Sequence, residues 1–266
     1  MQGSYRTIEL SDAPFESQGL RFLTVKTPNL LGRGDICLYI PKVEEGVDGL
    51  PIYILLHGVY GSAWIWAMKG GAHKAAEKLI SNKTIEPAII AMPSDGLWGD
   101  GSAYFSHHSK KFDHWIVNDV VTAIKENIQE AKNSIATCIG GLSMGGYGAL
   151  SLGARFPEKF KAISGHSSIT KLEQMALFVE EPLEAYLNNN DLPDVIDCIK
   201  LNQDKLPKLR FDCGVTDELI EPNRLLHKEL NDLNIEHIYE EFDGGHEWSY
   251  WIKHVEKTLV FFNKQK

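Results

Sequence analysis

The sequence has few cysteines, and none of them falls in a metal-type spacing. Its 266 residues include only four, and no two of them form a CxxC or similar pair. Three of the four lie in apolar segments, which is typical of small core residues in a reducing compartment. The cysteines are Cys37, Cys138, Cys198 and Cys213. We therefore expect no cysteine-based metal site.

Long apolar runs and an excess of positive charge are also missing. No apolar run is long enough to span a bilayer, and residues 1–7 lack the apolar core of a signal peptide. The formal net charge of −9 argues against nucleic acid or an anionic membrane as the main partner. We expect a cytoplasmic protein, or a secreted or periplasmic one whose leader has been removed. Homo-oligomerisation is left open.

The apolar residues, 43% of the chain, are enough for a sizeable core, and from about residue 50 they follow an α/β pattern. Continuous apolar runs alternate with amphipathic stretches, which predicts a mostly parallel sheet covered by helices on both faces. The expected strands are 51–56, 88–92, 134–139, 160–165, 209–214 and 236–242, and the expected helices are 70–81, 115–131, 147–156, 222–233 and 249–262. Ligands of such sheets bind beyond the carboxyl ends of the strands.

The remaining segments complete a single domain over residues 1–266. Three early strands have no helices between them, which predicts an antiparallel edge. These strands are 4–10, 20–26 and 35–40, with a turn at 32–34. Residues 167–206 are polar and less regular, include Asn188-Asn189-Asn190-Asp191, and are interpreted as a small cap inserted between strands.

Residues 139–148 contain the pattern Gly141-x-Ser143-x-Gly145 between an expected strand and an expected helix. This pattern is typical of a nucleophile elbow, in which a sharp strand-to-helix turn pushes the serine hydroxyl out of the backbone. Glycines are needed on both sides because a Cβ there would collide with the neighbouring strand or helix. The helix behind Ser143 would point its free N–H groups toward the reaction site.

A serine hydroxyl needs a base to take its proton, and His246 is the best candidate. It follows the last strand, after two glycines, and comes after Ser143 in the chain. His57 is the rival, but it precedes the serine. A carboxylate must orient the imidazole, and Asp217, just past a strand, lies between Ser143 and His246 in chain order. The alternative carboxylates are Asp243 and Glu218.

Two N–H donors are needed for the oxyanion of a tetrahedral intermediate. We expect them to be the amide of Met144, directly after the nucleophile, and that of Val59, in the His57-Gly58-Val59 turn. Aromatic side chains near these loops predict a pocket for an apolar or aromatic acyl group, or for a sugar. The candidate substrate-binding residues are His57, Trp66, Trp98 and Trp248.

The loop at residues 94–109 is too long to be a simple connection and is expected to help build the pocket. Asp95 and Asp100 within it are interpreted as parts of a solvated loop, and the alternative is contact with a polar leaving group. His107 and His108 lack the carboxylate or cysteine ligands that would make them a metal pair. We therefore expect no metal and no other cofactor.

At these motifs the sequence resembles the esterase D-like "putative esterase" family of α/β-hydrolases. The resemblance runs from about residue 35 to the C-terminus and is carried by residues 55–58, 141–150, 214–217 and 244–251. The Ser-Met-Gly-Gly elbow and the Gly-Gly-His-x-Trp-x-x-Trp ending are specific together. The family includes short-chain acyl esterases, acetylxylan and feruloyl esterases, S-formylglutathione hydrolases and bacterial mycolyltransferases.

The resemblance implies an α/β-hydrolase fold and a set of site residues: Ser143 as nucleophile, Asp217 as acid, His246 as base, and the Val59 and Met144 amides as oxyanion hole. Residues 247–251 differ from the signature of the S-formylglutathione hydrolases, which counts against that branch. The expected function is a serine carboxylesterase that acts on small-molecule or carbohydrate esters through an acyl-enzyme. The alternatives are acyl transfer to a sugar or other alcohol, an S-acyl thioesterase, and a non-catalytic binding protein on the same fold.

Overall fold

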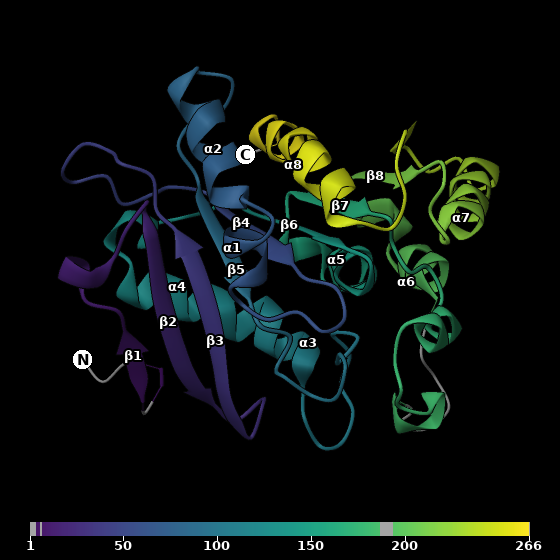
Figure 1. Ribbon diagram of the computed structural model, residues 1–266, viewed down its shortest axis with the longest axis horizontal. Helices are drawn as coiled ribbons and strands as arrows, with labels where there is room; N and C mark the ends of the chain where they lie inside the picture. Colours follow the sequence, from purple (N-terminus) through teal and green to yellow (C-terminus); the bar gives the residue numbers. More distant parts are fainter. Residues whose placement is uncertain (1–3, 6, 187–193, 266) are drawn as a thin grey trace.

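The computed structural model describes residues 4–5, 7–186 and 194–265. Asn188 to Asp191, which the sequence places in the cap, lie outside these ranges. The described residues form one nine-stranded sheet in the order β1-β2-β3-β5-β4-β6-β7-β8-β9 (Figure 1). Its strands are β1 (Ile8–Leu10), β2 (Leu20–Thr27), β3 (Gly32–Tyr39), β4 (Ile52–Leu56), β5 (Ile89–Pro93), β6 (Thr137–Leu142), β7 (Ala162–His166), β8 (Lys208–Gly214) and β9 (Ile238–Phe242).

The sheet is antiparallel at its N-terminal edge and parallel elsewhere. The pairs β1–β2, β2–β3 and β3–β5 are antiparallel. Every pair from β5 through β4, β6, β7 and β8 to β9 is parallel. This confirms the α/β fold class and the antiparallel edge that the sequence predicts.

Helices cover both faces of the sheet (Figure 1). Alternate side chains of β4 enter two different apolar cores, since Ile54 belongs to one and Tyr53 to the other. The first core takes residues of α4 (Val121–Asn127), α5 (Met144–Arg155), α6 (Val195–Leu201) and α7 (Ile220–Asp232). The second takes residues of α1 (Ile65–Met68), α2 (Ala72–Ser81) and α8 (Trp248–Asn263). Within the described ranges, no helix is both long and apolar enough to cross a membrane.

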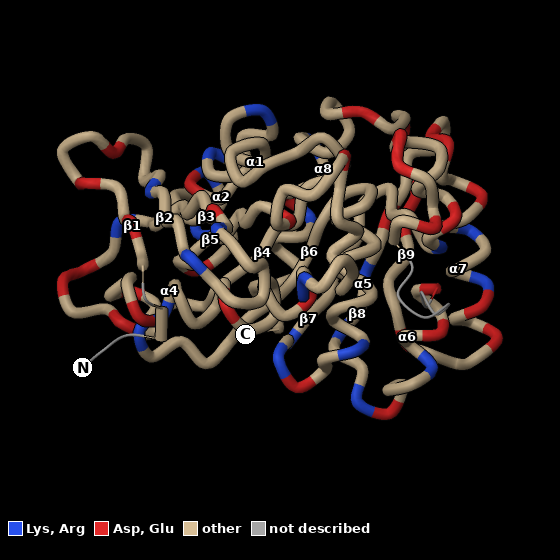
Figure 2. Tube along the Cα trace, turned by 90° about the horizontal axis from the view of Figure 1, so that it is seen from below, with Lys and Arg blue, Asp and Glu red and all other residues tan. Residues whose placement is uncertain are grey.

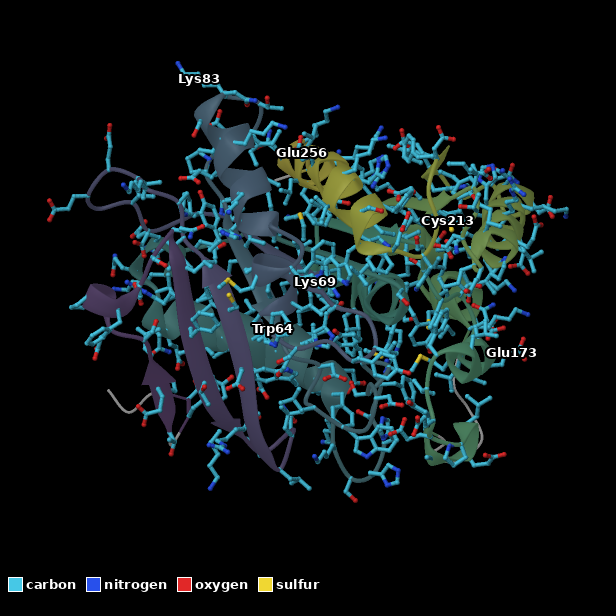
Figure 3. All side chains as sticks on the ribbon, in the orientation of Figure 1. Trp64, Lys69, Lys83, Glu173, Cys213 and Glu256 are labelled. Carbon is cyan, nitrogen blue, oxygen red and sulfur yellow. The ribbon has the colours of Figure 1, made fainter. Side chains whose placement is uncertain are left out.

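Charged side chains lie mainly away from the middle of the sheet. Figure 2 shows both signs interleaved around α6, α7 and β9, whereas the central strands β4 to β6 carry none. Glu256 of α8, labelled in Figure 3, forms an ion pair with Lys78 of α2 at 2.8 Å. All four cysteines are buried and unpaired, as expected of small core residues.

The glycines at residues 32–34 do not form the predicted turn. β3 already begins at Gly32, and the turn falls at residues 28–31. A Cβ on Gly34 would lie 2.5 Å from the ring of Trp115, so this glycine serves a close approach of strand and indole.

The predicted helix at 115–131 differs in form from the observed one. It starts earlier, at α3 (Phe112–His114), and continues through a π-helical turn at Trp115–Val120 into α4. It ends at Asn127, because Ile128 is extended and only a 3-10 turn, Gln129–Ala131, follows. The π-helical stretch carries two polar anchors: the Trp115 indole donates to the Ser94 carbonyl at 2.8 Å, and Asp119 accepts from Asn29 at 2.9 Å.

Residues 167–206 connect β7 to β8. Their described part consists of 3-10 turns at Leu172–Leu177, Leu183–Tyr186 and Gln203–Lys205, together with α6. α6 lies against α5 and contributes Cys198 and Ile199 to the core. The segment is therefore partly a helical crossover of the α/β pattern.

A buried polar cluster joins β7, β8 and α8 beneath the ends of the strands. Asp212 accepts hydrogen bonds from Tyr250 at 2.8 Å and from His166 at 3.0 Å, and pairs with Arg210 at 2.8 Å. His166 and Asp212 are fully buried, and Tyr250 and Arg210 are each 2% exposed. Burial alone would raise the pKa of Asp212, but the His166 and Arg210 partners lower it to about 2. The carboxylate therefore stays ionised and ties the start of α8 to the sheet.

Replacing Asp212 by asparagine should lower the free energy of unfolding at pH 7 by about 3 kcal/mol, because the buried Arg210 would lose one of its two carboxylate partners and keep only Glu240. The folded-state pKa lies below the ordinary value, so the stabilisation from Asp212 is complete above roughly pH 5 and is lost as the pH falls toward about 2. Asp212→Asn should remove this part of the acid destabilisation. Urea unfolding of both proteins across this pH range measures both effects.

Asp232→Asn is the matched control, because Asp232 pairs with Lys228 on the exposed surface of α7. We expect no measurable change in the free energy of unfolding of Asp232→Asn, since exposed ion pairs contribute little to stability. If both variants lost the same free energy of unfolding, the buried cluster would stabilise the fold no more than an exposed ion pair does.

Candidate active site

The turn between β6 and α5 holds Ser143 in a strained conformation. β6 ends at Leu142 and α5 begins at Met144, which leaves Ser143 between them with φ 55° and ψ −121°. A Cβ on Gly141 would lie 2.2 Å from the Gly145 carbonyl oxygen, and one on Gly145 would lie 2.3 Å from that of Leu56. Both positions admit only glycine, as the sequence pattern indicates.

Ser143 begins a chain of hydrogen bonds that includes two other predicted residues. Its Oγ lies 2.9 Å from Nε2 of His246, and Nδ1 of His246 lies 3.0 Å from a carboxylate oxygen of Asp217. An ionised carboxylate only accepts, so Nδ1 carries the proton and donates it to Asp217. Nε2 is then free to accept from the Ser143 hydroxyl.

Asp217 is held as an anion at the end of β8. Burial raises its pKa, but hydrogen bonds from His246 and the Leu219 amide, which donates at 2.8 Å, bring it below the ordinary value. Among the described residues, neither Asp243 nor Glu218 has a hydrogen bond to His246. Of the three carboxylates considered, Asp217 is the one in contact with the imidazole.

Two aromatic rings enclose the imidazole of His246. Phe178 stacks on one side, with ring centroids 4.9 Å apart and planes 20° from parallel. Trp251 stands edge-on at 5.0 Å and 90°. The Tyr60 hydroxyl donates to the Phe178 carbonyl. The Asp100 carboxylate accepts from the Glu180 amide at 2.9 Å. These contacts fix the chain that carries Phe178 over the site.

The predicted oxyanion amides lie on turns that press against each other. Met144 is the first residue of α5, so its N–H has no partner within the helix. No acceptor for the Val59 amide is found among the described residues. A Cβ on Gly58 would lie 3.3 Å from the Ser143 Cβ, which places this turn directly beside the nucleophile elbow.

A cavity of about 420 Å³ opens above Ser143. Its walls are mostly apolar, and Glu247 is the single carboxylate-bearing residue among the described side chains that line it. The lining residues are Gly58, Val59, Tyr60, Ile65, Leu142, Ser143, Phe178, His246, Glu247, Trp248 and Trp251. Such a site suits a small substrate with an apolar part.

The family model described as "Putative esterase" matches residues 30–262. The chain belongs to this esterase family. A protein named acetyl esterase from Caldicellulosiruptor saccharolyticus is 28% identical over 244 residues, which cover 84% of this chain and 88% of the relative. These findings confirm the resemblance stated from the motifs, and the protein is an enzyme of the serine hydrolase type.

Solved structures share the fold of this esterase. A ferulic acid esterase superposes with a TM-score of 0.77 at 20% identity, over 98% of this chain and 99% of that chain. An S-formylglutathione hydrolase from Staphylococcus aureus superposes with a TM-score of 0.77 at 17% identity, over 96% and 99%. These similarities identify the α/β-hydrolase architecture.

Only one of the four predicted substrate-binding residues lines the cavity of the esterase, namely Trp248. Trp66 is buried, and its indole N–H donates to the Leu56 carbonyl at 2.9 Å. Trp98 packs against His107, His108 and Tyr186. His57 is 2% exposed, and its ring nitrogens bond to the backbone of Gly58 and Asp95. The direction of each side chain depends on local backbone geometry, which spacing along the sequence does not specify.

The sequence interpretation missed several features of the site. Phe178 lies at the end of a 3-10 turn in an irregular segment, where no periodic pattern marks a lining residue. Trp251, in the first turn of α8, is mostly buried and also lines the cavity. Asp95, interpreted as solvated, is 2% exposed. The Asp95-Gly96 pair favours a turn, but such a two-residue pattern does not indicate that the loop folds around the Asp95 carboxylate.

The described residues contain no group of three histidine, cysteine or acidic side chains placed to hold a metal. His107 is fully buried, its Nε2 donates to the Ser102 carbonyl at 3.1 Å, and burial lowers its pKa to about 4. It is therefore a neutral core histidine.

Ser143→Gly should be more stable than Ser143→Ala by about 1 kcal/mol. Both variants lack the hydroxyl, but only glycine relieves the positive φ of Ser143, and this gain of about 1–3 kcal/mol exceeds the entropic cost of glycine in the unfolded chain. Urea unfolding at neutral pH provides the comparison.

Ser151, a buried residue within α5, is the control. There the order should reverse, because glycine inside a helix costs about 1 kcal/mol relative to alanine. The same order at both positions would argue against strain at Ser143.

Proposed function

We propose that this esterase hydrolyses small acyl esters through a covalent acyl-enzyme formed on Ser143. The observation that carries the proposal is the continuous hydrogen-bonded chain from Asp217 through His246 to Ser143 at the base of an apolar cavity. This arrangement activates a serine hydroxyl, which is otherwise a weak nucleophile.

In the first half of the reaction, Ser143 Oγ attacks the ester carbonyl while His246 Nε2 takes its proton. Asp217 stabilises the resulting imidazolium and fixes the ring through Nδ1. The Val59 and Met144 amides donate to the oxyanion, and the N-terminal end of α5 adds its positive dipole. His246 then returns the proton to the departing alcohol.

In the second half, a water molecule takes the place of the alcohol. His246 removes a proton from this water, which attacks the acyl carbon and forms a second tetrahedral intermediate at the same two amides. Collapse of this intermediate breaks the bond to Ser143 Oγ, which recovers its proton from His246, and releases a carboxylic acid.

The cavity and the relatives both support a proposal for the substrate class. Its aromatic and aliphatic walls favour an uncharged apolar acyl group. The relative named acetyl esterase supports a short acyl chain. We propose acetyl and other short-chain esters of small alcohols or carbohydrates as the substrates.

Ser143→Ala should abolish hydrolysis of p-nitrophenyl acetate, with a loss of about 10⁶ in kcat, because no other group can form the acyl-enzyme. Ser151→Ala, also buried but away from the cavity, should keep wild-type activity. Residual activity of Ser143→Ala above a small fraction of wild type would refute the assignment, provided that circular dichroism shows the fold intact.

Phe178→Ala should shift the acyl-chain preference toward longer esters. Removing this wall enlarges the cavity, and we expect the ratio of kcat/KM for p-nitrophenyl octanoate over acetate to rise by about tenfold. Leu177→Ala is the control, since the neighbouring Leu177 is 61% exposed and does not line the cavity. An unchanged chain-length profile in Phe178→Ala would show that Phe178 does not bound the acyl site.

A further inference from the structure

The loop at residues 94–104 folds around the buried carboxylate of Asp95. One oxygen accepts from the Leu97 amide at 2.9 Å, and the other accepts from the Ser102 amide at 2.6 Å. The Ser102 hydroxyl donates back to the Asp95 carbonyl at 2.8 Å. A buried carboxylate that accepts two amides ties both halves of a loop together. None of these residues lines the cavity above Ser143.

This loop is bonded at three points to the turn that follows β4. The Asp95 amide donates to Nε2 of His57 at 3.2 Å. The Tyr104 hydroxyl donates to the His57 carbonyl at 3.0 Å. The Tyr60 amide donates to the Asp100 carbonyl at 2.8 Å. His57 and Tyr60 flank Gly58 and Val59 in the sequence. The loop is therefore hydrogen-bonded to the turn on both sides of the Val59 amide.

The imidazole of His57 links the turn to the loop in a single tautomer. Nε2 accepts from the Asp95 amide, so the proton lies on Nδ1, which donates to the Gly58 carbonyl at 2.7 Å. A Cβ on Gly61 would lie 2.3 Å from Nδ1, which shows how closely the chain packs on this ring. The Gly58–Val59 peptide thus has its carbonyl side fixed by His57.

The same loop also touches the other turn of the site. A Cβ on Gly101 would lie 2.4 Å from the Met144 sulfur and 3.4 Å from a Val59 methyl carbon. Gly101 therefore packs directly against both residues whose amides form the proposed oxyanion hole.

From these contacts we infer that Asp95 and Tyr104 are positioning residues that hold the Val59 amide at the oxyanion through His57. The inference rests on the proposed function, and neither residue touches the substrate. Oxyanion donors act because they are already in place when the negative charge develops. A turn that drifts by a fraction of an ångström therefore weakens binding of the transition state more than binding of the ester.

Tyr104→Phe tests the inference, because it removes one hydroxyl and keeps the ring. Tyr53→Phe is the matched control: Tyr53 is also fully buried, on β4, and within the described structure its hydroxyl has no hydrogen-bond partner. We expect Tyr104→Phe to lower kcat for p-nitrophenyl acetate by about tenfold with KM within about twofold of wild type. Tyr53→Phe should leave both constants unchanged.

A second readout separates positioning from general loosening of the fold. A trifluoromethyl ketone of matching chain length adds to the nucleophilic serine and places an oxyanion between the two amides. In Tyr104→Phe its inhibition constant should rise by the same factor by which kcat/KM falls. Asp95→Asn should show the same pattern with a larger factor, because the amide nitrogen of asparagine cannot accept from a backbone N–H.

The outcomes are distinct. If the wild type is active but Tyr104→Phe has the same kcat and the same ketone inhibition constant as Tyr53→Phe, the positioning role is wrong and the proposed function stands. A rise in KM with unchanged kcat also overturns it. A wild type that shows no esterase activity overturns the proposed function instead.

Discussion

The close approach of two turns constrains the rest of the site. The β6–α5 elbow lies so near the end of β4 that glycine is required at Gly145, against the Leu56 and His57 carbonyls. Gly58 in turn lies against Leu142 and Ser143. The proposed nucleophile and the proposed oxyanion amides therefore belong to one tightly packed unit, and neither can shift without the other. The other parts of the site, from the His246 loop to the loop at 94–104, are arranged around this contact.

Electrostatics divides the acidic side chains at the end of β8 into two roles. Asp212 and Asp217 are both buried and both have lowered pKa values. Asp212 is enclosed by Arg210, His166 and Tyr250 and fastens α8 to the sheet. Asp217 faces His246, whose side chain is 15% exposed and borders the cavity. Asp212 thus secures the helix that follows His246 through the Tyr250 hydrogen bond, while Asp217 orients the imidazole itself through a hydrogen bond to Nδ1.

The parts of the fold and site that the sequence predicted are those governed by local backbone requirements. Buried strands, the glycines of the elbow and the order of Ser143, Asp217 and His246 all have short-range signals, and the structure brings these three residues together. Phe178 was not predicted, because it reaches the site from an irregular turn. Proximity in sequence predicts Trp66 and Trp98 at the pocket, but the Trp66 indole bonds to the Leu56 carbonyl and Trp98 packs against Tyr186. The glycines at 32–34 predict a turn, whereas Gly34 lies in β3 against the Trp115 indole. No short-range pattern in the sequence indicates that contact.

Phe178 has a wider consequence because of where it comes from. The proposed catalytic residues and oxyanion amides lie at the ends of β4, β6, β8 and β9. The wall beside them comes from the segment that follows β7. Its Leu172 and Met175 are buried in the core, and hydrogen bonds to Tyr60 and Asp100 hold the stretch around Phe178 over the site. Loops of this kind tolerate insertion and replacement far better than strands do. Replacing residues around Phe178 would therefore reshape the wall of the cavity and leave the residues at the strand ends unaltered.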